Sequence, residues 1–167
     1  GPEIVVSLKE KYKSQIFLDL KLHDIPKTVS NAFHSIKELP IDFLTVHLSG
    51  GEEMLTTLMN NIQKANSSLK ILGVSFLTSL ESKDTQQIFG LELSNQHFEK
   101  LFQLASQTNI AGVICSPHEV HLAKKINPQL ITVTPGLRFS DEIQHQQNIG
   151  DQKRIFPIAP IHYWLLK

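Results

Sequence analysis

Cysteine is almost absent from this chain, because Cys115 is the only one among 167 residues. A single thiol excludes a disulfide framework within the chain and is typical of a reducing compartment. Net charge is absent as well, since 16 basic and 16 acidic side chains cancel, which argues against a basic surface for nucleic acid. No apolar run approaches the about 20 residues that a membrane helix needs, and no signal peptide is recognisable. These absences predict a soluble, cytoplasmic, single-domain protein with no nucleic-acid or membrane partner.

A glycine-rich phosphate loop is also missing. Doubly wound sheets that bind nucleotides usually carry spaced glycines in their first turn, whereas the nearest approach here, HLSGGEE at 47–53, has two adjacent glycines. The chain instead alternates apolar strand-like segments with helix-like ones. The predicted strands cover residues 15–21, 42–47, 69–77, 112–115 and 130–134. The predicted helices between them cover residues 27–39, 52–65, 95–108 and 117–125.

This alternation predicts βαβ units and therefore an α/β fold. A (β/α)8 barrel needs about 250 residues, or about 31 per unit. At that rate a chain of 167 residues supplies about five units. A five-stranded doubly wound sheet fits the same count, so the pattern alone leaves both architectures open.

The stretch FLDLKLHDIPKTV (17–29) ends the first predicted strand in alternating charge. Because successive strand residues point to opposite faces, we expect Asp19 and Lys21 on one face and Asp24 in the loop that follows. The other face is expected to pack under helices through Leu18, Leu20 and Leu22. Two interpretations remain: a solvated ion pair worth about 0–1 kcal/mol, or an active site at the carboxyl end of a barrel strand.

The next four predicted strands also finish in polar residues. They read TVHLSGG, SFLTS, VICSPHE and TVTPGLR, which places His47, Thr78, Ser116 and Arg138 around one end of the sheet. Each residue has a structural interpretation as well: a buried core histidine, a helix cap for Thr78 or Ser116, and a solvated loop arginine. Taken together with the charged strand, the four strand ends favour a site.

The motifs FLDLKLHDIPKTV, VHLSGG, LTS, GVICSPHE, VTPGLR and DQKRI occur in this order, and the chain resembles the bacterial type of orotidine 5'-phosphate decarboxylase. The resemblance extends from the first residue to about residue 155. It implies an incomplete (β/α)8 TIM barrel, in which about strands three to seven are present and the chain is truncated at both ends. Residues 1–167 then form a single partial barrel domain, with residues 156–167 as a divergent tail whose HYWLL is a remnant of the eighth strand.

The resemblance also implies an activity: decarboxylation of orotidine 5'-phosphate to uridine 5'-phosphate in de novo pyrimidine biosynthesis, usually by a homodimer. Neither a metal nor an organic cofactor takes part in that reaction. A metal site is not favoured by the residues either, because His118 and His121 lie three apart on a predicted helix without a cysteine or carboxylate set to complete one.

Residue by residue, Lys21 matches the catalytic lysine that delivers a proton to pyrimidine C6, and Asp19 matches the carboxylate beside it. Asp24 matches an aspartate that reaches into the partner subunit's site. The remaining matches lie at the nucleotide, its pyrimidine edge and its phosphate, and they are Ile25, Thr28, Thr78, Ser116, Arg138 and Gln152. The chemistry is coherent, because loss of carbon dioxide leaves negative charge on a ring carbon where a fixed cation stabilises it. Flanking carboxylates favour the charged form of such a lysine, and a remote phosphate supplies binding energy.

The chain departs from the family pattern at both ends. Residues 1–14 are predicted as a helix and lack the aspartate and second lysine of the two preceding strands, and the Gly-Arg of the eighth strand is absent. We therefore expect two unpaired sheet edges, an exposed apolar inner face, poor stability or self-association, and weak activity. Two alternatives stay open: a non-catalytic remnant that binds nucleotide or dimerises, and a related sugar-phosphate decarboxylase.

Overall fold

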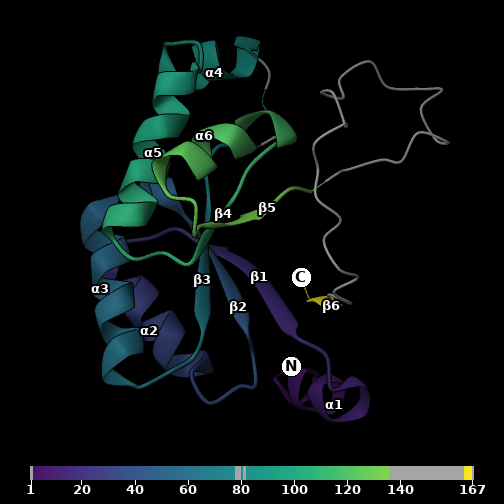
Figure 1. Cartoon of the computed structure of the whole chain (residues 1–167). Helices are drawn as coiled ribbons and strands as arrows, with labels where there is room; N and C mark the ends of the chain where they lie inside the picture. Colours follow the sequence, from purple (N-terminus) through teal and green to yellow (C-terminus); the bar gives the residue numbers. More distant parts are fainter. Residues whose placement is uncertain (1, 78–79, 81, 136–163, 167) are drawn as a thin grey trace, which may run out of the picture.

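A single parallel β-sheet organises the chain in the computed structural model, which describes residues 2–77, 80, 82–135 and 164–166 (Figure 1). Its strands are β1 (Ile16–Leu22), β2 (Phe43–His47), β3 (Lys70–Val74), β4 (Gly112–Ile114), β5 (Ile131–Val133) and β6 (Trp164–Leu166). The strand order is β5-β4-β3-β2-β1-β6, and every neighbouring pair is parallel. All five predicted strands are therefore confirmed, although β3 ends at Val74 and not at residue 77.

Helices precede β1 and connect the strands from β1 to β5 in sequence. They are α1 (Glu3–Tyr12), α2 (Pro26–Ile36), α3 (Gly51–Lys64), α4 (Ser82–Phe89), α5 (Asn95–Gln107) and α6 (Val120–Ile126), with short 3₁₀ turns η1 (Leu48–Gly50) and η2 (Pro117–Glu119). The helix expected within residues 1–14 is present as α1, and the one expected over 117–125 is divided between η2 and α6. The sequence pattern missed α4. None of the helices in the described parts of the chain has the length and apolar character needed to cross a bilayer.

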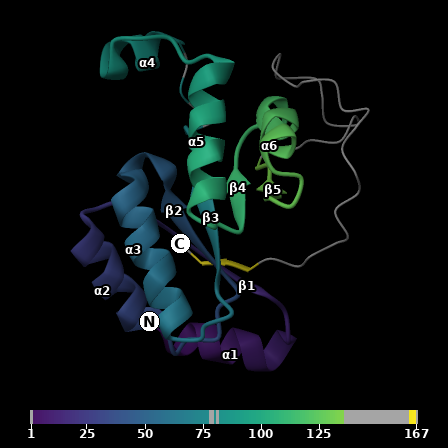
Figure 2. The ribbon, with the colours of Figure 1, turned by 60° about the vertical axis from the view of Figure 1, so that its left-hand side comes forward.

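Three of the helices cover one face of the sheet. Figures 1 and 2 show α2, α3 and α5 on the same side of the strands. The larger apolar cluster fills this layer and joins Leu44 and Val46 of β2 to Phe33 of α2, Leu55 of α3 and Phe102 of α5. All five side chains are fully buried, so this layer holds most of the hydrophobic stabilisation.

The opposite face of the sheet carries a second, smaller cluster. Its buried members, Phe17, Phe43 and Leu72, all belong to strands, and they are at most 6% exposed. The expectation of an exposed apolar inner face is therefore wrong at these three positions. Helices on one face and strands in sequential order are the features of a barrel wall, whereas a doubly wound sheet places helices on both faces and reverses its strand order.

Two further expectations about β1 are corrected by the structure. Leu20 does not pack under the helices, because it is 44% exposed, while Leu18 is buried and Leu22 contacts the larger cluster. The outer edge of β1 is not unpaired either. It pairs with β6, with Ile16 opposite Trp164. β6 belongs to the segment predicted as a remnant of the eighth strand. In sequential barrel order that strand would pair with β5, whereas β6 lies at the other edge of the sheet, beside β1.

Candidate active site

The carboxyl end of β1 departs from regular strand geometry where its charged residues lie. Leu18 pairs with Leu44 and Leu22 pairs with Val46. Three residues of β1, Asp19, Leu20 and Lys21, therefore stand opposite the single residue Thr45 of β2. This arrangement is a β-bulge in β1. Lys21 has a φ of 48°, in the left-handed region that side-chain-bearing residues rarely adopt. Such local strain is common where a side chain is directed into a functional site.

Thr45 bridges the bulge from the neighbouring strand. Its Oγ1 accepts the backbone N–H of Lys21 at 2.8 Å and donates to Oδ1 of Asp19 at 2.8 Å. Thr45 is fully buried, and it lies on the same face of β2 as Phe43, opposite to Leu44 and Val46. One hydroxyl group thus ties together the backbone of the lysine and the carboxylate of the aspartate.

Asp19 and Lys21 form an ion pair at this end of the sheet. The ammonium Nζ of Lys21 donates to Oδ2 of Asp19. The two side chains differ in exposure, because that of Asp19 is 7% exposed and that of Lys21 is 39% exposed. The carboxylate of Asp19 is therefore shielded from solvent, while the ammonium of Lys21 that it holds remains partly accessible. The pair differs in this respect from a surface ion pair in which both groups are solvated.

Two histidines border this pair. The rings of His23 and His47 lie 5.0 Å apart between their centroids, and His47 ends β2 on the same face as Thr45. Burial lowers the pKa of His47 below its usual 6.5, and the nearby His23 and Lys21 lower it further, while Asp19 acts in the opposite direction. His47 is therefore favoured as a neutral ring, one that can accept or donate a hydrogen bond beside the lysine.

The HLSGG segment turns the chain from β2 into α3. Gly51 has a φ of +86°, which only glycine adopts without strain. A Cβ at Gly50 would lie 3.4 Å from Cδ2 of His23 and would overlap the side chain of Met54. The two adjacent glycines thus allow the turn and the close approach of His23, and they do not form a spaced phosphate loop.

The predicted residues after β1 lie at the start of α2. Asp24 is exposed, and its Oδ1 accepts the backbone N–H of Ile25 at 2.7 Å. Ile25 is 65% exposed, and Thr28 is exposed on the first turn. The structure therefore brings Asp19 and Lys21 together, while the carboxylate of Asp24 is engaged with its own loop.

The other predicted site residues lie farther along the chain. Ser116 caps η2: its hydroxyl accepts the N–H of His118 at 3.3 Å, and its own N–H donates to Oε2 of Glu119 at 2.7 Å. The cap interpretation of Ser116 is thus confirmed, and a contact with substrate stays a prediction. The predictions for Thr78, Arg138 and Gln152 lie outside the described residues.

Next to Ser116, Cys115 is fully buried. Burial, with a smaller contribution from Glu119, raises the pKa of this thiol to about 12. A thiol of that kind stays protonated at neutral pH and is a poor nucleophile. Across the described residues, no group of three or more His, Cys, Asp or Glu side chains is arranged to hold a metal ion.

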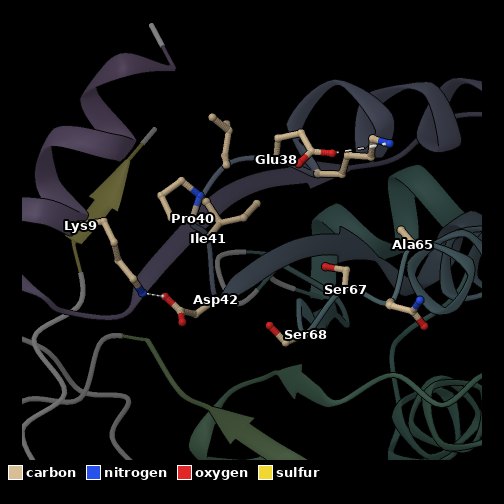
Figure 3. A pocket seen from close by; sticks show the side chains of 11 residues that line it. Lys9, Glu38, Pro40, Ile41, Asp42, Ala65, Ser67 and Ser68 are labelled. Atoms are coloured by element: carbon tan, nitrogen blue, oxygen red, sulfur yellow. Dashed lines mark hydrogen bonds and ion pairs between the residues drawn. The ribbon is translucent and has the colours of Figure 1, made fainter.

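A different polar region lies at the amino ends of the strands. It is a pocket of about 500 Å³ between α1, the approach to β2 and the loop after α3 (Figure 3). Lys9 of α1 reaches across to Asp42, with 2.6 Å between Nζ and Oδ2, and the same Oδ2 accepts the N–H of Ile16 at 2.7 Å. In barrels this end serves stability, and reactions occur at the carboxyl ends. We therefore place the candidate site at Asp19, Lys21, Thr45 and His47.

The arrangement can supply a proton and stabilise negative charge. A lysine ammonium beside a buried carboxylate is a fixed cation, and fixed cations stabilise charge that develops in a transition state. Sequence reasoning found this pair and His47 but missed Thr45 and His23. The available signal for Thr45 was a polar residue at an alternate position of an otherwise apolar strand, two residues before His47 and on the same face.

Comparison with known proteins agrees with these observations. Residues 1–159 match the family described as "Orotidine 5'-phosphate decarboxylase / HUMPS family". An orotidine 5'-phosphate decarboxylase from Staphylococcus saprophyticus is 36% identical over 157 residues, which is 93% of this chain and 66% of that protein. The one from Aquifex aeolicus is 39% identical over 164 residues, which is 95% of this chain and 66% of that protein.

A solved structure shows the same relationship in three dimensions. The crystal structure of orotidine 5'-phosphate decarboxylase from Lactobacillus acidophilus superposes with a TM-score of 0.74 at 34% identity, covering 83% of this chain and 64% of that one. The chain thus spans less than two thirds of the length of these relatives. The predicted resemblance and the predicted assignment to an incomplete barrel are both confirmed. This chain belongs to the orotidine 5'-phosphate decarboxylase / HUMPS family.

Proposed function

We propose that this chain carries the proton-donating strand of an orotidine 5'-phosphate decarboxylase, which forms uridine 5'-phosphate and carbon dioxide in de novo pyrimidine biosynthesis. The observation that carries the proposal is the Lys21 ammonium held by the buried carboxylate of Asp19 at the carboxyl end of β1. The curated relatives that match 93% and 95% of the chain bear this activity in their names.

In the proposed reaction, the bond between pyrimidine C6 and the carboxylate carbon breaks, and its electron pair stays on C6. Carbon dioxide leaves, and Nζ of Lys21 gives its proton to C6. The cation is present before the charge forms, so little reorganisation is needed in the transition state. Asp19 orients the ammonium and crowds the substrate's carboxylate, and the neutral ring favoured at His47 adds no second positive charge beside it.

We assign the remaining contacts by family resemblance. Thr78 and Ser116 would contact the nucleotide and its pyrimidine edge, and Arg138 and Gln152 would contact the phosphate. The phosphate contacts supply binding energy that is used at the distant reacting bond. No metal or organic cofactor is required in this scheme, since the developing charge is met by a lysine.

A homodimer is part of the proposal. Asp24 and Thr28 would reach the partner's site, with Ile25 beside them, and the support is that all three are exposed at the start of α2. Residues 1–167 would act as one partial barrel domain, with residues 156–167 as a divergent tail, in the cytoplasm. Mixing Lys21→Ala subunits with Asp24→Asn subunits tests this arrangement, because hybrid dimers regain one intact site only if Asp24 acts across the interface.

The activity is tested by measuring carbon dioxide release from orotidine 5'-phosphate by the purified chain. We expect release that Lys21→Ala lowers by about 10²- to 10⁴-fold, the range typical of a lost general acid. Lys64→Ala, at the exposed end of α3, is the matched control and should leave the rate unchanged. Turnover that survives in Lys21→Ala would refute the assignment of the proton donor.

A binding measurement separates the alternatives. Titration with uridine 5'-phosphate reports on the nucleotide site independently of catalysis, and we expect Arg138→Ala to weaken it more than Lys21→Ala does. Binding without turnover would identify a nucleotide-binding chain that is not catalytic. Turnover of a keto-sugar phosphate in place of orotidine 5'-phosphate would identify a sugar-phosphate enzyme of the same family.

A further inference from the structure

We infer that Thr45 is a positioning residue for Lys21, acting through its hydroxyl group on both the backbone of the lysine and the carboxylate that holds its ammonium. The inference rests on the proposed function only for its effect on turnover. Its geometric content, that one hydroxyl on β2 fixes the conformation of the charged end of β1, stands independently of the substrate.

The directions of the two hydrogen bonds of Thr45 follow from chemistry. An ionised carboxylate only accepts and a backbone N–H only donates, whereas a hydroxyl has one donor and can accept as well. The hydroxyl hydrogen therefore points to Oδ1 of Asp19, and its lone pair receives the N–H of Lys21, each at 2.8 Å. Asp19 then presents Oδ2 to Nζ of Lys21, so both carboxylate oxygens have an assigned direction.

The bulge explains why a side chain is needed here. In a regular parallel ladder, backbone carbonyls accept the N–H groups of the adjacent strand. Between the pairs Leu18–Leu44 and Leu22–Val46, three residues of β1 stand opposite one residue of β2, which disrupts that pattern. The hydroxyl of Thr45 supplies the acceptor for Lys21, whose φ of 48° is otherwise unfavourable. Loss of this acceptor would leave the part-buried N–H of Lys21 without its partner from β2 and would destabilise this conformation.

Burial limits what else can take the place of this hydroxyl. Thr45 is fully buried, so its own Oγ1 is shielded from bulk water, and both hydrogen bonds lie in a part-buried position. Valine has nearly the same shape as threonine but lacks the hydroxyl, and serine keeps the hydroxyl but lacks the methyl group. Thr45→Val and Thr45→Ser therefore separate positioning by the hydroxyl from packing by the methyl group.

The experiment compares these two variants with Thr108→Val. Thr108 is another buried threonine, and its hydroxyl donates to the carbonyl of Leu104 at 2.7 Å at the end of α5, within the helix layer. The Thr108→Val variant shows the effect of losing a structural hydroxyl that makes no contact with the Asp19–Lys21 pair. For each purified chain we would measure thermal unfolding, amide hydrogen exchange of Lys21, and kcat and KM for orotidine 5'-phosphate.

In Thr45→Val we expect the Lys21 amide to exchange about tenfold faster, as for the loss of one hydrogen bond, and kcat per folded molecule to fall about 10- to 100-fold. KM should stay within about threefold, because displacement of a catalytic group acts mainly on the chemical step. Thr45→Ser should retain both values within about threefold. Thr108→Val should change only the unfolding temperature.

The inference is overturned if Thr45→Val leaves Lys21 exchange unchanged, or if Thr45→Ser is impaired as strongly as Thr45→Val. It is also overturned if kcat in Thr45→Val falls only in proportion to the folded fraction, as a purely structural role predicts. If the unmodified chain shows no turnover of orotidine 5'-phosphate, the proposed function fails, and the exchange rates of Lys21 alone then decide the role of Thr45.

Discussion

Two lysine–aspartate pairs lie at opposite ends of the same strands and differ in their surroundings. At the amino end, Lys9 and Asp42 are about equally exposed, at 32% and 29%, and the carboxylate also accepts the N–H of Ile16 at the start of β1. At the carboxyl end, Asp19 is 7% exposed and Lys21 is 39% exposed, and the lysine backbone is left-handed within a bulge.

The two pairs have different effects on the strands that they join. The amino-end pair joins α1 to the first residues of β1 and β2 and leaves the ladder regular there. The carboxyl-end pair lies where the bulge interrupts the ladder and holds a partly exposed cation, and local strain of this kind is common at functional sites. Function at one end and stability at the other is the usual arrangement in barrels.

Among the changes that leave Lys21 in place, removing the charge of Asp19 should have the strongest effect. Asp19→Asn keeps an acceptor for Thr45 but no longer holds the ammonium of Lys21 by charge. We expect turnover per folded molecule to fall about 100-fold, as for a displaced catalytic group, with little change in the urea midpoint. Activity close to that of the unmodified chain would show that the Asp19–Lys21 pair matters no more for turnover than the Lys9–Asp42 pair does.

The next effect belongs to the amino end. Asp42→Ala removes the acceptor of Lys9 and of the Ile16 N–H. We expect the free energy of unfolding to fall by about 1.5–3 kcal/mol, since hydrogen bonds to charged groups are lost, with turnover per folded molecule unchanged. Lys37→Ala is the control, because its 3.7 Å pair with the exposed Glu38 should contribute little. A variant as stable as the unmodified chain would show that this end is not structural.

The strain at Lys21 can be measured directly by comparing two substitutions that both remove the side chain. Glycine adopts a φ of 48° without cost, whereas alanine does not. We expect Lys21→Gly to be about 1 kcal/mol more stable than Lys21→Ala in urea unfolding, reduced somewhat by the greater freedom of glycine in the unfolded chain. Equal stabilities, or a more stable alanine variant, would show that the left-handed backbone at Lys21 is not strained.

The smallest expected effect is a dependence of stability on pH through His47. The pKa of His47 in the folded state lies below its usual value of 6.5. At a pH between the folded pKa and 6.5, the unfolded state therefore binds more protons than the folded state. Stability therefore rises with pH across that window and is lost as pH falls through it. His47→Gln should flatten this acid-side slope in thermal unfolding measured from pH 7.5 to pH 5. His34→Gln, on the exposed surface of α2, should leave the slope in place.

Much of the fold was predictable because it depends on local pattern. Apolar runs alternating with helical spacing predicted the βαβ order, and the closely spaced charges of FLDLK predicted that Asp19 and Lys21 lie together, as their ion pair confirms. The bulge was not predictable, since it arises from pairing between β1 and β2, residues distant in sequence. Leu20 was misplaced for the same reason, because regular alternation does not hold across a bulge.

Other differences also have a long-range origin. The pairing of β6 with β1 joins residues about 150 positions apart in the chain, and no local pattern specifies such a contact. α4 is short and, among its described side chains, buries mainly Thr85, so its apolar spacing is weak. Thr45 was overlooked because a lone threonine in a strand is ordinary until its partners are known.

We expect the carboxyl-end lysine, Lys21, to act in chemistry and the amino-end lysine, Lys9, to act in stability. The most direct test measures carbon dioxide release from orotidine 5'-phosphate by Lys21→Ala and Lys9→Ala side by side, per folded molecule. We expect turnover to fall about 10²- to 10⁴-fold in Lys21→Ala and to stay at the unmodified rate in Lys9→Ala. Equal rates in the two variants, or loss of turnover in Lys9→Ala alone, would contradict it.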